Sequence, residues 1–99
     1  MVGREPFIAC YMMSNRRHGT LYIGVTGNLI QRAVQHREDE FPGFTRRYGL
    51  HRLVWYETHD IMVDAIRREK SLKRYPRDWK LNLIEAMNPQ WEDLLPGLL

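Results

Sequence analysis

The strongest constraint on the fold is the alternation of apolar and polar residues across residues 20–26. Such alternation is typical of a β-strand, because successive side chains of a strand point to opposite faces. One face carries Leu21, Ile23 and Val25, and the other carries Thr20, Tyr22, Gly24 and Thr26. Because Gly24 has no side chain, we expect the Tyr22 phenol to lie beside an open space.

A second run with strand character lies upstream at residues 7–13, and the polar residues 14–19 between the two runs are typical of a turn. The simplest arrangement is an antiparallel hairpin. If Ile8, Cys10 and Met12 share the buried face of the downstream strand, Tyr11 lies on the same face as Tyr22. The two runs therefore predict a pair of tyrosines on one face of a hairpin.

The rest of the chain is expected to add one strand and several helices. The predicted elements are helix 29–38, an irregular basic segment 44–49, strand 50–58, helix 61–75, helix 77–87 and one further turn within 90–95. Asn28 and Asp60 are the expected caps of the first two helices, and Pro76 is expected to separate the last two. The order β-β-α-β-α-α predicts an α+β fold in which helices cover a small sheet.

Length and composition narrow the class of protein. We expect 99 residues to form a single domain, 1–99, without a separate DNA-targeting domain. No apolar run is long enough to span a membrane, so a membrane protein is not expected. The single cysteine, Cys10, excludes a disulfide framework and is expected in the core, which makes a cytoplasmic location the simplest interpretation.

Positive charge is concentrated in two parts of this chain, whose formal net charge is +3. The basic residues considered as contacts to a polyanion are Arg46, Arg47, Lys70, Lys73 and Arg74. A one-sided basic stripe fits a nucleic-acid partner. A solvated helix face is the alternative, and the sequence leaves both open.

Glu69 is the most informative carboxylate. The helix 61–75 has an apolar stripe of Ile61, Met62, Ala65, Ile66 and Leu72, and on a helical wheel Glu69 falls near its middle. An unpaired carboxylate facing a sheet is costly, so Glu69 is expected to have a partner or to lie at the rim of the core. One alternative is an ion pair with a neighbouring Lys or Arg. The other is a divalent cation such as Mg²⁺, which takes only one or two protein carboxylates.

Arg32 and His36 are four residues apart in the first predicted helix, so they share one side of it. Each has a common structural alternative as a surface residue, and each tyrosine could simply pack its ring. The three tryptophans, Trp55, Trp79 and Trp91, are expected in the core or between helices. A phenol, a guanidinium and a carboxylate-held cation nevertheless form a coherent set for phosphodiester hydrolysis. No HExxH, paired CxxC, Walker or GxSxG motif supports another enzyme class.

The chain resembles the GIY-YIG nuclease superfamily, in particular its small stand-alone bacterial members. The YIG triplet is literal at residues 22–24, and the GIY triplet is degenerate at residues 9–11, where only Tyr11 is kept. The arginine, histidine and glutamate of the family fall on Arg32, His36 and Glu69. The resemblance covers about residues 6–93.

The resemblance implies a three-stranded mixed sheet flanked by helices, one Mg²⁺ or Mn²⁺ ion and cleavage of DNA. By carry-over, Tyr11 or Tyr22 assists deprotonation of the attacking water, Arg32 stabilises the phosphate and Glu69 holds the metal. His36 would support proton transfer or phosphate binding. The lysine that some members place after the YIG triplet is absent, and the late asparagine of some members could be Asn82 or Asn88.

The sequence therefore predicts a metal-dependent endonuclease of DNA, with RNA as an alternative substrate, in repair, recombination or the processing of branched or single-stranded DNA. The main alternative is a nucleic-acid-binding module that keeps the fold and cleaves poorly or not at all. A small protein-interaction domain is a third. Targeting is left open between weak sequence preference, recognition of unusual structures, and help from a partner protein or a second copy.

Overall fold

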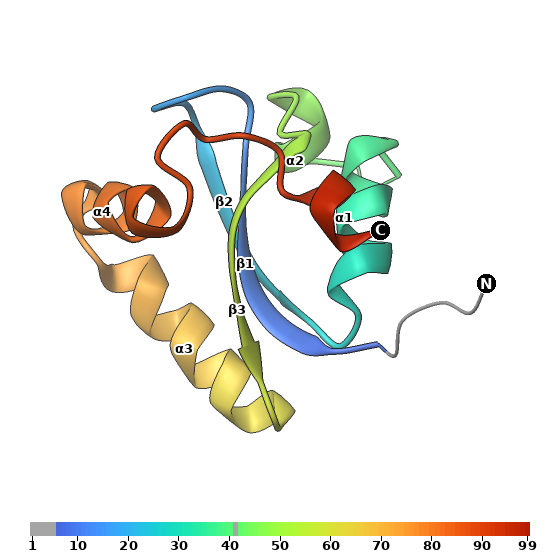
Figure 1. The fold of residues 1–99 in the computed structure, drawn as a ribbon, viewed down its shortest axis with the longest axis vertical. Helices are drawn as coiled ribbons and strands as arrows, with labels where there is room; N and C mark the ends of the chain where they lie inside the picture. Colours follow the sequence, from blue (N-terminus) through green and yellow to red (C-terminus); the bar gives the residue numbers. More distant parts are fainter. Residues whose placement is uncertain (1–5, 41) are drawn as a thin grey trace.

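The computed structural model describes residues 6–40 and 42–99. Its elements are β1 (Ile8–Ser14), β2 (Leu21–Thr26), α1 (Leu29–Arg37), α2 (Phe44–Arg47), β3 (Arg52–His59), α3 (Met62–Arg74), α4 (Arg77–Met87) and the 3-10 helix η1 (Leu95–Leu98). Figure 1 shows three layers, with the sheet between α1 and η1 on one side and α3 and α4 on the other. The predicted α+β fold, a three-stranded sheet flanked by helices, is confirmed.

The strand order is β2-β1-β3, and both pairings are antiparallel. The predicted β1–β2 hairpin is confirmed, but the prediction that the sheet is mixed is wrong. The physical reason is the place of β1. The strands β2 and β3 run in the same direction, yet β1 lies between them, so no parallel pair forms.

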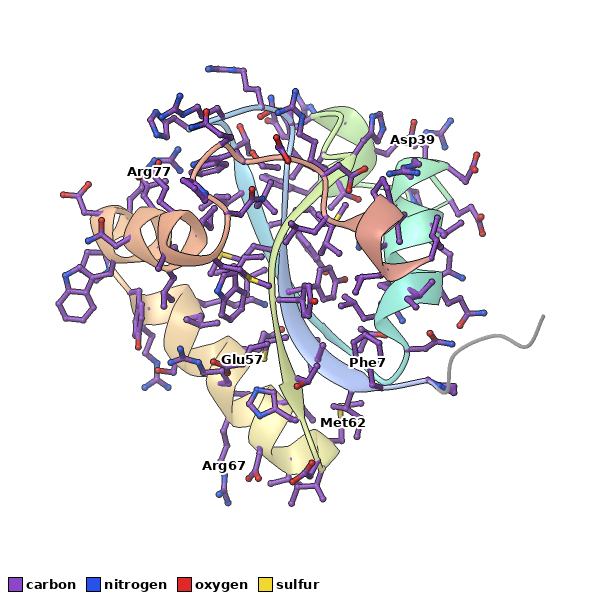
Figure 2. The ribbon with its side chains drawn as sticks, viewed as in Figure 1. Phe7, Asp39, Glu57, Met62, Arg67 and Arg77 are labelled. Carbon is purple, nitrogen blue, oxygen red and sulfur yellow. The ribbon has the colours of Figure 1, made fainter. Side chains whose placement is uncertain are left out.

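The predicted faces of the hairpin are also confirmed, because Cys10 lies opposite Val25 and Met12 lies opposite Ile23. The core on the α3 and α4 side of the sheet consists of Cys10, Met12, Ile23, Val54, Trp55, Ala65, Leu72, Ile84 and Trp91. The core on the α1 and η1 side consists of Ala9, Tyr11, Met13, Leu29, Ala33, Leu50, Leu53, Leu95 and Leu98. Figure 2 shows side chains filling the space on both sides of the sheet. Tyr11 and Tyr22 thus belong to the α1 side.

Cys10 is a core residue, as expected. Its thiol donates a hydrogen bond to the backbone carbonyl of Ala65, with 2.8 Å between sulfur and oxygen. Burial, followed by the nearby carboxylates of Glu57 and Glu69, raises the pKa of the thiol to about 11. The thiolate that a nucleophile needs is therefore scarce at neutral pH.

Helix ends follow the predicted signals in part. The Asn28 side chain accepts a hydrogen bond from the Gln31 backbone N–H at 3.2 Å, so it caps α1 as predicted. Pro76 directly precedes α4, also as predicted. The predicted Asp60 cap is wrong, because Ile61 occupies the N-cap position of α3 in an extended conformation without a side-chain hydrogen bond. The segment predicted as irregular contains the one-turn helix α2.

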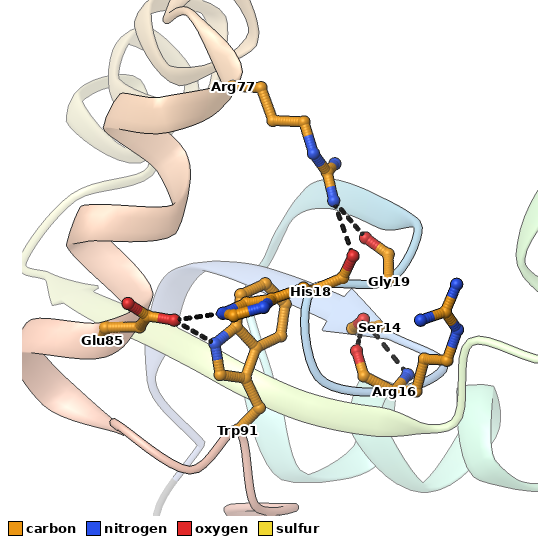
Figure 3. A network of polar contacts seen from close by, with 7 residues as sticks. All are labelled: Ser14, Arg16, His18, Gly19, Arg77, Glu85 and Trp91. Atoms are coloured by element: carbon orange, nitrogen blue, oxygen red, sulfur yellow. Dashed lines mark hydrogen bonds and ion pairs between the residues drawn. The ribbon is translucent and has the colours of Figure 1, made fainter.

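A polar network, shown in Figure 3, ties the turn between β1 and β2 to α4 and to the segment after it. The Glu85 carboxylate accepts hydrogen bonds from Trp91 Nε1 at 3.0 Å and from His18 Nε2 at 2.6 Å. The Arg77 guanidinium donates to the backbone carbonyls of His18 and Gly19 at 3.0 and 2.7 Å. The network therefore joins parts of the chain more than fifty residues apart.

None of the helices within residues 6–40 and 42–99 has the length and apolar character needed to cross a bilayer.

Candidate active site

Two tyrosines and a histidine meet between the sheet and α1. The Tyr11 ring is fully buried, and its hydroxyl is hydrogen-bonded to His36 Nε2 at 2.9 Å. The Tyr22 ring is half-buried and lies against both, with ring centroids 6.2 Å from Tyr11 and 5.5 Å from His36. The predicted pair of tyrosines on one face is therefore present, but only Tyr22 reaches the surface.

The space directly above Gly24 is not open, because the Tyr11 ring fills it. A Cβ atom added at Gly24 would lie 2.5 Å from both Cζ and the hydroxyl oxygen of Tyr11. Gly24 is thus needed for the close approach of this ring to the backbone of β2. The alternation of a strand shows which face Tyr11 occupies, but it does not show that the ring leans across the neighbouring strand.

The helix α1 supplies the other two groups. Arg32 and His36 lie on the same side of α1, as their spacing predicted, and the Asn28 cap fixes where that helix begins. The His36 side chain is buried, with 4% of its surface exposed, whereas Arg32 is half-buried. His36 therefore does not fit the alternative of a surface histidine.

Burial and the Arg32 charge set the protonation states of this cluster. Burial first, and then the nearby Arg32 guanidinium, lowers the pKa of His36 to about 4. Burial, followed by the neighbouring Tyr22, raises the pKa of Tyr11 above its usual range, while Arg32 acts in the opposite direction. At neutral pH the imidazole is consequently uncharged and the Tyr11 phenol keeps its proton.

The cluster opens into a small hollow of about 170 Å³. Its lining includes Tyr22, Arg32, His36, Pro42, Phe44 and Thr45. A phenol, a guanidinium and an imidazole thus line one concave surface. Such a site can hold an anionic group by charge-assisted hydrogen bonds from the guanidinium.

A second hollow, of about 330 Å³, shares Tyr22 and Phe44 with the first. Its lining also includes Leu21, Ile23, Lys73 and Lys80. Because Lys73 belongs to α3 and Lys80 to α4, this hollow brings cations from the opposite helical layer to Tyr22. It does so along β2, which is an edge strand of the sheet.

A model of the GIY-YIG catalytic domain matches residues 7–82 of this chain. The chain belongs to the GIY-YIG family. The members of this family are nucleases, which act on nucleic acids and generally use divalent metals. The resemblance to the GIY-YIG superfamily is thereby confirmed at the level of the family.

The similar proteins found by sequence and by structure are UPF0213 proteins, and these names state no activity. A UPF0213 protein of Staphylococcus epidermidis is 30% identical over 67 residues, which are 68% of this chain and 82% of the relative. A UPF0213 protein of Staphylococcus saprophyticus is 29% identical over 68 residues, covering 69% and 83%. The solution NMR structure of a UPF0213 protein from Bacillus halodurans is similar to this fold, with 24% sequence identity and a TM-score of 0.54. The match covers 87% of this chain and 90% of the other. At that identity it supports the fold.

Glu69 of this GIY-YIG chain is joined to the cluster only indirectly. Its carboxylate forms an ion pair with Lys73 at 3.1 Å, one helical turn along α3, and 16% of its side-chain surface is exposed. The half-exposed Lys73 in turn lines the hollow that contains Tyr22. The predicted ion pair is therefore present, and of its two members Lys73 shares a hollow with Tyr22 whereas Glu69 lines none of the three hollows among the described residues.

The Glu69 carboxylate also fits a divalent cation. It is a hard oxygen donor at the rim of the core, and Mg²⁺ commonly keeps several waters while using one or two carboxylates. Among the described residues, no group of three or more His, Cys, Asp or Glu side chains gathers into a larger ligand set. A cation at Glu69 would therefore be bound mostly by water and substrate, and it would compete with the Lys73 ammonium.

The predicted nucleic-acid contacts divide into two groups. Arg46 and Arg47 are exposed on α2, where they line a third hollow of about 560 Å³, and Lys73 lines the second. Lys70 and Arg74 are exposed on α3 and line none of the three hollows in the part of the chain that the structure describes.

Sequence reasoning missed Phe44 and Lys80 as neighbours of Tyr22. Lys80 carried a signal, because residues 67–80 are rich in Lys and Arg and Lys80 is the last of them in the sequence, but Phe44 carried none. Asn88 is structural: its amide donates to the carbonyls of Val54 and Glu92 at 3.1 and 2.7 Å. Asn82 is exposed on α4.

Proposed function

We propose that this protein is a divalent-cation-dependent endonuclease that hydrolyses DNA phosphodiester bonds. The observation that carries the proposal is the hollow lined by Tyr22, Arg32 and His36. It shares Phe44 with two further hollows, one lined by basic residues of α2 and the other by basic residues of α3 and α4. An arginine beside a phenol on a concave, basic surface suits a phosphodiester, because the guanidinium can hold two phosphate oxygens at once.

Hydrolysis forms a bond from water oxygen to phosphorus and breaks the bond to the leaving sugar oxygen. One proton leaves the water for bulk solvent through its hydrogen bond to the Tyr22 hydroxyl, and one proton from solvent water reaches the leaving oxygen. Tyr22 is the phenol placed to contact the water, because it is half-buried and lines the hollow. Arg32 holds the phosphate and stabilises the charge that grows on it.

Tyr11 and His36 act as positioning residues in this proposal. Tyr11 is fully buried, so it does not touch the substrate, and its hydrogen bond to His36 holds both rings against Tyr22. A histidine whose pKa is about 4 is a weak base at neutral pH. We therefore assign His36 a hydrogen-bonding role at the wall of the hollow rather than a role in proton transfer.

Glu69 would hold the cation, which when bound polarises the phosphate and stabilises the leaving oxygen. The carboxylate must exchange its Lys73 partner for the cation. The Glu69–Lys73 ion pair is also the observation that favours the second candidate, a binding module of the same fold that cleaves poorly. In that case the Lys73 pair would persist when substrate is present.

The test is nicking of supercoiled plasmid and cleavage of labelled single-stranded, duplex and branched oligonucleotides, in Mg²⁺, Mn²⁺ or EDTA. Tyr22→Phe, Arg32→Lys and Glu69→Gln are compared with Glu92→Gln, a change at an exposed glutamate outside the three hollows. We expect cation-dependent cleavage that falls at least about tenfold in the first three variants and is kept in the control.

Cleavage that survives Arg32→Lys and Glu69→Gln together would contradict the assigned site. Salt-sensitive binding without cleavage of any substrate would support the binding module instead.

A further inference from the structure

We propose that Phe44 and Tyr48, with Arg47, form a stacking surface for unpaired bases beside the candidate active site. The preferred substrate of this chain is then DNA with a single-stranded segment next to the bond that is cleaved. The cleavage part of this inference rests on the proposed function, whereas the binding part can be tested without any cleavage.

The two aromatic rings are exposed together. Phe44 has 48% and Tyr48 has 46% of its surface exposed, and their ring centroids are 4.9 Å apart with an angle of 50° between the planes. Single apolar side chains on a surface are ordinary, but two adjacent exposed aromatic rings beside a hollow form a patch that can bind something. The rings lie on one side of α2 because they are four residues apart.

Arginine completes this surface. The Arg47 guanidinium lies over the Tyr48 ring, with 5.5 Å from Cζ to the ring centroid. Planar guanidinium groups and aromatic rings are the side chains on which single-stranded nucleic acids stack their bases. The hollow of about 560 Å³ at this place is lined by Pro42, Gly43, Phe44, Arg46, Arg47 and Tyr48. It therefore combines stacking groups with cations for the phosphates.

The stacking surface is continuous with the candidate active site. Phe44 and Pro42 line both this hollow and the one with Tyr22, Arg32 and His36. A base stacked on Phe44 would thus belong to a nucleotide close to the phosphate held by Arg32. In a duplex both faces of a base are covered by its neighbours, so only an unpaired or displaced base can stack on a side chain.

Charge decides between nucleic acid and an apolar peptide as the occupant. Arg46 and Arg47 border the rings on one side, and Lys73 and Lys80 line the hollow on the other side of Phe44. Cations on both sides of an aromatic pair suit a chain of phosphates that carries bases. An apolar or basic peptide would leave these charges without partners.

The test measures binding by fluorescence anisotropy in EDTA, where cleavage does not occur. The probes are labelled single-stranded DNA, the same strand with abasic sites, the corresponding duplex, and single-stranded RNA of the same sequence. The abasic strand keeps every phosphate and lacks the bases, so it separates stacking from charge. Quenching of a 2-aminopurine base in the strand reports stacking directly.

The variants are Phe44→Ala, Tyr48→Ala and Phe44→Leu, with Trp79→Ala as the matched control. Trp79 is a 57% exposed aromatic residue on α4 that lines none of the three hollows among the described residues. We expect Phe44→Ala and Tyr48→Ala each to weaken single-strand binding about tenfold and to abolish quenching. Phe44→Leu should behave as Phe44→Ala. Duplex and abasic-strand binding should change little in any variant, and Trp79→Ala should bind as wild type.

Equal affinity of the wild-type protein for the abasic and the complete strand would overturn the inference, as would equal losses on duplex and single strand. Retained binding after Phe44→Leu would show an apolar contact instead of stacking, and it would also overturn the inference. Tighter binding of the RNA strand than of the DNA strand would overturn the assignment of the substrate to DNA.

The two proposals fail in different ways. Stacking without cleavage in any cation leaves this inference intact and removes the endonuclease. Cation-dependent cleavage that is unaffected by Phe44→Ala on all substrates leaves the endonuclease and removes the stacking surface.

Discussion

Gly24 and Tyr11 face each other across the β1–β2 pairing so closely that a Cβ atom on residue 24 would lie 2.5 Å from the Tyr11 hydroxyl oxygen. The same hydroxyl is hydrogen-bonded to His36 on α1. The glycine therefore lets a buried ring reach from the central strand to the helix above the edge strand. This relationship links a backbone position in β2 to the geometry of the candidate active site.

The first prediction is that Gly24→Ala destabilises the protein by about 1–3 kcal/mol, because the added methyl group must displace the Tyr11 ring from a packed site. Urea unfolding of both proteins measures the difference. Gly97→Ala is the control, since a Cβ atom there meets nothing within 4 Å. A Gly24→Ala protein as stable as wild type would mean that the Tyr11 ring is free to move aside.

The second prediction separates the two tyrosines. Tyr11→Phe should cost about 1–3 kcal/mol of stability, because His36 Nε2 loses a buried hydrogen-bond partner. Tyr22→Phe should cost less than about 1 kcal/mol, since that side chain is half-buried, yet it should reduce cleavage more strongly. Unfolding and cleavage are measured on the same preparations. The reverse ranking of stabilities would contradict the burial seen here.

The third prediction concerns pH. Because the pKa of His36 falls from 6.5 to about 4 in the folded protein, the unfolded chain binds more protons between these values. The free energy of unfolding should therefore decrease as the pH falls from 6.5 toward 4, and this contribution should level off below about 4. A single group can supply at most about 1.4 kcal/mol per pH unit.

His36→Gln isolates this contribution, because the carboxylates that also titrate in this range are the same in both proteins. The stability of His36→Gln should fall less steeply with acid than that of wild type. Parallel curves for the two proteins would assign the acid sensitivity to other groups. An NMR titration of the imidazole gives the folded pKa independently.

The fourth prediction follows from the ion pair of Glu69. If a cation replaces Lys73 at the carboxylate, Lys73→Gln should lower the Mg²⁺ concentration needed for half-maximal cleavage. It should also weaken DNA binding, because Lys73 lines the hollow beside Tyr22. Cleavage across a Mg²⁺ series and binding in EDTA separate the two effects. Arg74→Gln, on the exposed side of α3, is the matched control.

Local patterns predicted the parts of this fold that depend on neighbours in the sequence. Alternation over residues 20–26 placed Tyr22 on its face, and a helical spacing of four placed Arg32 beside His36. Asn28 and Pro76 marked the starts of α1 and α4 through their own backbone chemistry.

The remaining features depend on tertiary packing. The helix α2 has only four residues and no side-chain cap, so neither periodicity nor capping could reveal it. Its Phe44 lines two hollows together with Tyr22, a residue far from it in the sequence. Trp79 was expected in the core or between helices. Its ring packs edge-on against Tyr75 at the end of α3, yet 57% of its surface is exposed. The packing between elements determines which side chains are exposed, and a single sequence does not reveal that packing.

The network around Glu85 bears on how long a piece of this chain must be to fold. The family match ends at residue 82, yet Trp91 is fully buried and shares the Glu85 carboxylate with His18 of the β1–β2 turn. Leu95 and Leu98 fill the opposite core. A fragment trimmed to the matched region would expose apolar surface on both sides of the sheet and would lose the contact of Glu85 with His18, so the smallest stable unit extends well past the signature that identifies it.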